Sequence, residues 1–499
     1  MIAGHGLLFG TVSVWLTPLW LLSVGVACGL VVLAIAYGMA ALASPRLAAF
    51  IRMSVAEGIL LPLTVLAIFL TAFALLTTPV VPYRELLGAV SRIPVVGDTQ
   101  TAVTIEPATE KFSIPLESLR VRPVELQGFE LRSDGSLLVV THVKKGAGHE
   151  GEVNLTAGKV FEWRKSSPTE EAMAPDLMDW SATNLTDKPI HLQILTHTDI
   201  EYPEVRVVPA VALGLIAIYA VYLAIGLAFP KVAAIAATTS KESMGQPLFP
   251  VAVGLGAFAI LLFVIIPYNT FGEDVKMFKD SGLTSVMLLA ILVAVWSASV
   301  SVADEIEGRT ALTLLSKPVR RHQFILGKFL GILWPVVLLF VLLGVWLLFC
   351  IPYKVVYDAR EVAKLEPTWQ VCYWEMISTV PGLVLAFYEA VILASISVAI
   401  STKLPMLPNL IICTAIYVLG HLVPTLVNSS VGKFEIVQFV GQLIAIVLPV
   451  LDHLNIQASI AAGRPVPLEY LGWTAAYTVL YSTIAMLVAL ALFEDRDLA

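Results

Sequence analysis

The densest group of ionisable side chains lies between Ala303 and Lys328, in the sequence ADEIEGRTALTLLSKPVRRHQFILGK. This segment carries eight formal charges between two long apolar runs, so it cannot lie in hydrocarbon. Its three acidic residues are Asp304, Glu305 and Glu307, and its five basic residues are Arg309, Lys317, Arg320, Arg321 and Lys328. Lys and Arg accumulate in the cytoplasmic loops of membrane proteins. We therefore expect segment 303–328 on the cytoplasmic side.

One carboxylate, Glu389, lies inside an apolar run, in the sequence AFYEAVILAS. A charged side chain at that depth is costly and normally faces a helix bundle, a partner or a water-filled path. Two interpretations stay open. Glu389 is either a pathway or gating carboxylate, or a structural group that bonds to a neighbouring helix through His421 or a tyrosine. His421 and Pro424 interrupt the run 404–427, where we expect them to kink and pack the helix.

Motifs for enzymatic chemistry are absent from the sequence. No G-x-x-x-x-G-K-[ST] occurs, because Gly158-Lys159 is followed by Val160 and lacks the earlier glycine. There is also no H-E-x-x-H and no G-x-S-x-G. We therefore predict no catalytic residue, no resident metal and no cofactor, and any ATP hydrolysis would belong to a separate subunit.

The cysteines do not have the spacing of a metal site or a redox pair. They stand at Cys28, Cys350, Cys372 and Cys413. Cys350 and Cys372 flank one loop that we expect outside, where a disulfide could form. Four packed thiols are the favoured interpretation.

Long apolar runs must position these groups. Hydrophobic residues make up 58% of the chain and charged residues 14%, which is typical of membrane proteins. Runs of about twenty apolar residues can cross a bilayer as helices. The predicted spans are 19–43, 56–78, 208–229, 248–268, 282–302, 328–351, 378–400, 404–427 and 469–493, with 434–451 as a shorter tenth candidate. The sequence thus predicts a polytopic α-helical protein with about nine or ten membrane helices.

Counting spans backward from the cytoplasmic segment places 44–55 and 230–247 inside and 79–207 outside. Arg46 and Arg52 fit an inside position for 44–55. The same count leaves the N-terminus outside. A short amphipathic elbow at the cytoplasmic surface would suit Lys241 to Pro247, and 434–468 is a candidate for a re-entrant outer segment.

The segment 79–207 changes to a polar composition over a length typical of one domain. Alternating runs at 136–144 and 190–198, separated by turn signals such as Asp134-Gly135, predict a β-rich extracytoplasmic domain, as a small sandwich or barrel. It would serve as a receptor for substrate or partner, or as a spacer. Its histidines are His142, His149, His191 and His197. Alternation places His191 and His197 on one face, but no carboxylate or thiol at ligand spacing indicates a metal site.

Segment 303–328 has the features of a lever between the membrane and a cytoplasmic protein. Its three carboxylates would lie at the N-terminal end of a short helix, where they favour the helix dipole. Gly308 permits a sharp bend, and Pro318 would end or kink the helix. Leu312, Leu315 and Val319 form an apolar stripe that could dock into a groove.

The same segment resembles the cytoplasmic segment of type-2 ABC transporter permeases, with the pattern acidic-E-x-G-T, L-L, S-x-P, an Arg and G-K. The matching residues are Glu305, Glu307, Gly308, Thr310, Leu314, Leu315, Ser316, Pro318, Arg321, Gly327 and Lys328. The ending with Phe493, Arg496 and Asp497 is similar to the aromatic-x-x-R-D finish of that family, although Glu494 and Asp495 replace the usual basic residue. The resemblance covers about 241–499, and the first half shows no family pattern.

The sequence thus divides into N-terminal helices 1–78, the outer domain 79–207, and a helix and cytoplasmic linker 208–240, followed by 241–499, which the resemblance implies is a six-helix permease core. It implies a multi-pass subunit of the cell (plasma or inner) membrane, dimeric with a second copy or a similar permease. A separate ABC ATPase would bind ATP and Mg²⁺. Relatives serve copper-enzyme maturation or export lipids, peptides or drugs, so export is favoured and the substrate stays open. Nucleic acid is not an expected partner.

Two other function classes stay open. A secondary transporter driven by an ion gradient would use Glu389 and the proline-broken spans at the midplane of the membrane. A membrane-anchored receptor or assembly protein would act through the domain 79–207, but would leave the charged segment without a role.

Overall fold

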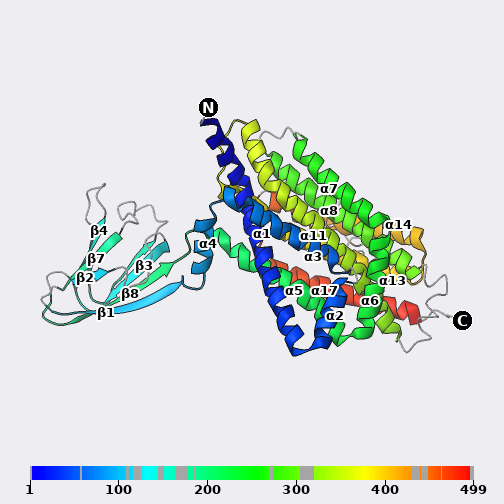
Figure 1. Ribbon diagram of the computed structural model, residues 1–499, viewed down its shortest axis with the longest axis horizontal. Coiled ribbons are helices and arrows are strands. Elements are labelled where there is room, and N and C mark those ends of the chain that lie inside the picture. The colour runs from blue at the N-terminus through cyan, green and yellow to red at the C-terminus, as the bar shows by residue number, and fades with distance from the viewer. Residues whose placement is uncertain are drawn as a thin grey trace. The chain divides into compact units, whose positions relative to one another are not determined.

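The chain divides into two compact units, one helical and one built mainly of strands (Figure 1). The helical unit contains Met1–Val81 and Val207–Ala499, and the second unit is Pro82–Arg206, within the predicted insertion 79–207. This computed structural model describes residues 3–56, 59–107, 112–115, 125–143, 151–164, 177–184, 186–266, 268, 273–303, 320–428, 439, 448–461 and 463–494.

Long helices dominate the first unit, because a helix satisfies its own backbone hydrogen bonds where water is absent. Eight described helical segments are long and apolar enough to cross a membrane, and α14 contains a further, shorter apolar stretch, Met406–Leu422. The helices are α1 (Ala3–Ala43), α2 (Pro45–Ala56), α3 (Leu61–Thr77), α5 (Val207–Ala228), α6 (Pro230–Gly245), α7 (Leu248–Ile265), α8 (Asp274–Ala298), α11 (Arg321–Glu361), α12 (Trp369–Ile377), α13 (Val380–Ser401), α14 (Met406–Asn428), α16 (Gln457–Ala461) and α17 (Leu468–Glu494).

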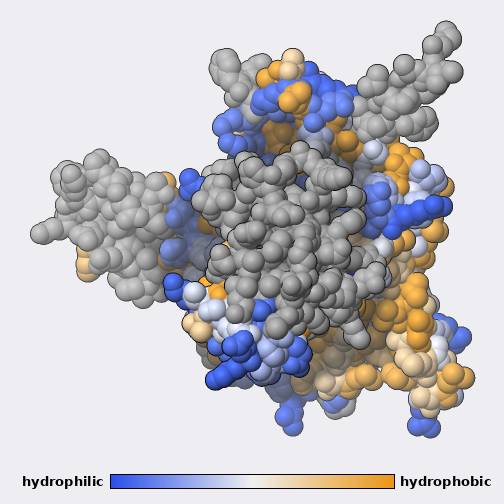
Figure 2. All heavy atoms as spheres, turned by 90° about the vertical axis from the view of Figure 1, so that its left-hand side faces the viewer, coloured by the Kyte–Doolittle hydropathy of each residue, from blue (hydrophilic) through white to orange (hydrophobic). Residues whose placement is uncertain are grey.

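This architecture confirms a mostly helical, multi-pass membrane protein. Apolar side chains, orange in Figure 2, cover broad areas of the described surface. Phe69, Phe258 and Trp473 are examples of large apolar side chains that are more exposed than buried. In a soluble protein such surface would favour aggregation, whereas lipid tails cover it in a membrane. The tenth candidate span, 434–451, lies mostly outside the described residues.

Helices in the structure extend beyond several of the predicted spans and into the predicted connections. The predicted span 328–351 belongs to α11, a helix of 41 residues that runs from Arg321 to Glu361. The predicted loop 44–55 forms α2, and the predicted linker 230–247 contains the helix α6. Hydropathy locates only the apolar centre of a helix, so it misses polar ends and amphipathic helices that continue beyond it.

The second unit contains two four-stranded sheets in which every strand pair is antiparallel. One sheet has the order β1-β8-β3-β6 and the other β2-β7-β4-β5. A short helix, α4 (Tyr83–Arg92), precedes them. The strands are β1 (Asp98–Ile105), β2 (Phe112–Pro115), β3 (Leu126–Ser133), β4 (Leu137–Val143), β5 (Gly151–Leu155), β6 (Val160–Arg164), β7 (Leu177–Asn184) and β8 (Ile190–Thr198). The predicted strands at 136–144 and 190–198 are confirmed as β4 and β8.

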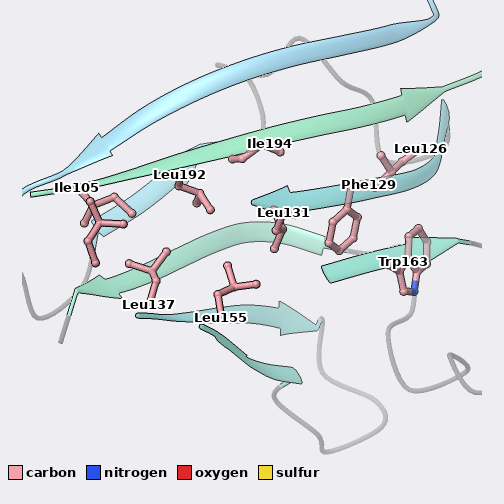
Figure 3. Close-up of a cluster of buried hydrophobic side chains, with 10 residues drawn as sticks. Ile105, Leu126, Phe129, Leu131, Leu137, Leu155, Trp163, Leu192 and Ile194 are labelled. Atoms are coloured by element: carbon pink, nitrogen blue, oxygen red, sulfur yellow. The ribbon is translucent and has the colours of Figure 1, made fainter. Parts of the chain in front are cut away.

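The two sheets share one apolar core, so this unit is a sandwich (Figure 3). Phe129 and Leu131 of β3 and Ile194 of β8 point from one sheet toward Leu137 and Leu155 of the other. Along β8, buried and more exposed residues alternate, as the period-2 pattern predicts. The exposed set includes His191, and His197 lies on the same side of the strand.

Candidate functional site

Most of the predicted coupling segment lies outside the described residues, which resume at 320 after Ala303. This applies to Asp304, Glu305, Glu307, Gly308, Thr310, Leu314, Leu315 and Pro318. The structure does describe both flanks of the segment. On one side α8 continues into a short π-helix, η5 (Ser299–Ala303), and on the other side α11 begins at Arg321.

The start of α11 is fixed to the end of the chain's last helix. Arg321 donates a hydrogen bond from its guanidinium to the backbone carbonyl of Glu494, with N and O 3.0 Å apart. One turn further, the ring of Phe324 stacks on that of Phe493, with 5.7 Å between their centres. Both rings are fully buried. The structure therefore brings the charged segment's basic end together with the aromatic residue near the C-terminus, two features that are far apart in the sequence.

Lys328 is also buried, close to the same aromatic pair. Its ammonium group lies 5.7 Å from the centre of the Phe324 ring, a distance typical of a cation–π interaction. The Lys328 side chain is almost wholly enclosed, and its part in the coupling segment stays a prediction. Arg320 and Arg321, at the start of α11, are exposed.

Two glycines let α6 approach α11 closely. A Cβ atom on Gly327 would lie 2.7 Å from the Cβ of Ile235, and one on Gly331 would lie 2.6 Å from the Cβ of Thr239. A real Cβ atom could not lie so close to these neighbours, so only glycine allows the two helices to approach to this distance at both positions. The hydroxyl of Ser240 also donates to the carbonyl of Gly331 at 3.0 Å. The helix that follows the charged segment is thus held against α6.

On the other flank, one buried amide joins three helical elements. The Nδ2 of Asn409 on α14 lies 2.9 Å from the hydroxyl of Ser299 at the start of η5. It also lies 2.8 Å from Ser397 and 2.9 Å from Ser401, both on α13. All four residues are fully buried. We did not predict this network, although the i, i+4 spacing of the two α13 serines would place them on one helix face.

Glu389 is fully enclosed on α13, and its neighbour is the predicted one. Its Oε1 lies 3.4 Å from Nε2 of His421 on α14, and neither carboxylate oxygen makes a hydrogen bond with a described residue. The other ring nitrogen of His421, Nδ1, lies 3.0 Å from the carbonyl of Tyr417. A carbonyl only accepts hydrogen bonds, so Nδ1 donates in this contact while Nε2 lies nearest Glu389.

A lone pair on Nε2 would repel an ionised Glu389 carboxylate at this distance, whereas a hydrogen on either atom would make the contact attractive. Pro424, the other predicted kink residue, follows on the same helix α14.

In the sandwich unit, the histidines contact separate polar groups. Nδ1 of His197 lies 2.7 Å from Asp98 and its Nε2 lies 3.6 Å from Glu130. The hydrogen bond with Asp98 raises the pKa of His197, against the opposing effect of burial. His191 contacts the hydroxyl of Thr104 at 3.0 Å. Within the described residues, no three His, Cys, Asp or Glu side chains could hold a metal ion together. Neither His149 nor the side chain of His142 is among the parts of the molecule described.

The cysteines are all free thiols, and the less favoured disulfide between Cys350 and Cys372 is not formed. Those two and Cys413 are buried, whereas Cys28 is exposed. In comparisons with known proteins, no family model and no curated protein matches this chain.

Proposed function

We propose that this chain is the membrane subunit of an ATP-driven transporter of the type-2 ABC permease kind, with ATP hydrolysis in a separate subunit. The ordered pattern of segment 303–328 carries the proposal. Substrate export follows from the resemblance. The contacts of the two flanking helices support a role for this segment in transmitting force, since each flank is tied to other helices.

The lever would act as follows. A partner that pushes on segment 304–319 would displace α8 through η5 and α11 through Arg321. From η5 the displacement would be transmitted to α13 and α14 through Asn409, and from α11 it would be transmitted to α6 and α17. Helices connected by buried polar and close-packed contacts move together, because a well-packed interior transmits strain. A displacement of this one segment would then reach four other helices.

The test is to purify the tagged full chain from its native membranes in mild detergent and identify co-eluting proteins by mass spectrometry. We expect a P-loop ATPase in near-equal amount. Leu315→Asp should abolish its recovery, because the charge interrupts the apolar stripe, and Glu305→Lys should uncouple ATP hydrolysis from transport.

The matched control is Leu365→Asp. Leu365 lies between α11 and α12 and is 95% exposed, so the same substitution there disturbs no packing. This variant should keep the ATPase. If the folded wild-type chain elutes reproducibly without a nucleotide-binding protein, or if Leu315→Asp retains the ATPase as well as Leu365→Asp does, the proposal is wrong.

One observation favours the second function class, a transporter driven by an ion gradient. Glu389 is fully buried in the helical unit and approaches His421 to 3.4 Å, and a buried acid beside an imidazole would suit a proton-coupled transporter. In liposomes with an imposed pH gradient and no ATP, such a transporter would move its substrate, and Glu389→Gln would stop it. Absence of any gradient-driven flux, together with ATP-dependent flux, would exclude this alternative.

A further inference from the structure

An apolar cavity of about 540 Å³ lies between α2, α5, α6 and α11 in the helical unit. Its volume falls in the range of small-molecule binding sites. Small side chains on α5 and α6 create this volume, among them Ala217, Ala233 and Ala237. Aromatic and aliphatic residues on α11, such as Trp334 and Leu330, form the opposite wall. Met53 and Val221 line it and are more exposed than buried, so the cavity opens at the surface.

Three of the polar side chains in the lining are hydrogen-bonded to backbone carbonyls. The Trp334 indole donates to the carbonyl of Ile59 at 3.0 Å, and the hydroxyl of Ser54 donates to the carbonyl of Phe50 at 3.0 Å. Ser240 donates to carbonyls of α6 and α11. Water in the cavity would find few partners, because ordered water needs two to four polar contacts. Hydrocarbon is therefore the favoured occupant.

Two of the helices that line the cavity are rich in cations. α2 and α6 together carry four basic residues, Arg46, Arg52, Lys231 and Lys241, and one acidic residue, Glu242. Arg52 precedes the lining residue Met53, and Lys231 follows the lining residue Pro230. All four cationic side chains are exposed. Basic residues beside an apolar surface favour anionic lipid headgroups.

We propose that this cavity binds one acyl chain of an anionic phospholipid, with the lipid phosphate beside the cations of α2 and α6. The bound lipid differs from the general lipid around the protein. Its acyl chain is enclosed by four helices, and its headgroup is selected by charge. The bound acyl chain contacts Leu330, Leu333 and Trp334, about three turns after the start of α11. It therefore stabilises the position of the helix that follows segment 304–319.

Native mass spectrometry tests the proposal with the full chain in detergent. The probe is an equal mixture of phosphatidylglycerol and phosphatidylcholine with identical acyl chains. We expect one phosphatidylglycerol to remain bound through delipidation, at least tenfold in excess of phosphatidylcholine. Ala237→Phe fills the cavity and should reduce retained lipid at least tenfold. Ala259→Phe, an equal change on α7 away from the cavity, should retain it.

The headgroup is tested separately by Arg52→Gln combined with Lys231→Gln, which should keep a bound lipid but lose the preference for phosphatidylglycerol. Should Ala237→Phe fail to elute as a monodisperse species, the smaller change Ala233→Leu takes its place. Equal retention of the two lipids by the wild-type chain, or unchanged retention in the folded cavity-filling variant, would show that the cavity holds only bulk lipid and would overturn the proposal.

Discussion

Glu389 and His421 face each other across the contact between two helices. Glu389 is fully buried, and the two side chains approach to 3.4 Å across the contact of α13 with α14. The Tyr417 carbonyl fixes the hydrogen of His421 on Nδ1, so that Nε2 faces the acid. The structural and the gating interpretations of Glu389 both stay predictions, because neither carboxylate oxygen makes a hydrogen bond with a described residue.

A double-mutant cycle will measure this pair. Glu389→Leu or His421→Leu alone leaves a buried polar group without its partner, which costs about 1–3 kcal/mol. The double variant removes both groups, so we expect it to be more stable than the sum of the single effects by about 0.5–3 kcal/mol. Unfolding in mixed micelles gives the free energies. Additive effects would contradict the pairing, and Glu389→Leu combined with the distant Gly254→Ala should be additive.

A second prediction concerns the pH dependence of the sandwich unit. Because the hydrogen bond with Asp98 raises the pKa of His197 in the folded state, the protonated imidazole favours folding. This contribution is fully present below about pH 6.5, the pKa in the unfolded chain. It is lost as the pH rises through the raised folded pKa. Hydrogen exchange of β8 amides, corrected for intrinsic rates, should show protection falling across that window.

The control for this prediction is the neighbouring histidine on the same strand. His197→Gln should remove the pH dependence, whereas His191→Gln should keep it, since the imidazole of His191 contacts the hydroxyl of Thr104 and its contact with Asp134 is made by the backbone amide. Equal pH profiles in the wild type and His197→Gln would mean that the Asp98 contact has no effect on stability.

At the scale of elements, the contact of α6 with α11 positions the base of the candidate site. Gly327 and Gly331 are one helical turn apart and both meet α6 without room for a Cβ atom. Gly327 is also the glycine of the G-K in the family pattern. In this structure a glycine is needed at that position because α6 packs directly against it. The neighbouring Ser240 closes the contact with a hydrogen bond to the Gly331 carbonyl. This contact also forms one side of the apolar cavity.

We expect Gly331→Ala to destabilise the helical unit by about 1–3 kcal/mol, the usual cost of overpacking. The added methyl group would meet the Cβ of Thr239 and the carbonyl of Ala236, and a backbone carbonyl cannot swing aside. Gly254→Ala on α7 is the matched control, because its Cβ would meet nothing within 4 Å. That variant should be neutral or more stable by up to about 1 kcal/mol, since alanine is the better helix former. Thermal unfolding in one detergent compares the two.

At the scale of the whole helical unit, the helix ends meet as the predicted sidedness requires. Arg321 at the start of α11 contacts Glu494 at the end of α17, and both positions are predicted to be cytoplasmic. Near the other end of α11, Lys354 donates to the carbonyl of Val264 at 3.2 Å, at the end of α7. Trp15 of α1 packs on Tyr353, with the ring centres 5.9 Å apart. These contacts agree with the span count that leaves the N-terminus outside.

Cysteine labelling in sealed cells tests this sidedness in a Cys28→Ser background. We expect Ser316→Cys and Lys403→Cys to react only after the membrane is permeabilised, because both lie in predicted cytoplasmic connections. Leu365→Cys should react directly with an impermeant maleimide, since it is strongly exposed in the connection between α11 and α12. Labelling of positions 365 and 316 from the same side would contradict the topology. The buried cysteines provide the unreactive background.

The sequence by itself determined the membrane class, the positions of the apolar helices and two strands of the insertion, β4 and β8. Those features depend on hydropathy and periodicity, which can be read from residues that are neighbours in the sequence. Only the tertiary structure decided that Phe324 meets Phe493, that Asn409 joins Ser299 to α13, and that α2 and α6 are helices enclosing a cavity. Glu389 was recognisable from its apolar surroundings, but its 3.4 Å approach to His421 depends on how α13 packs on α14. Contacts between helices in lipid depend on side-chain shape and a few polar groups, because hydrophobicity is uniform there and selects no particular face.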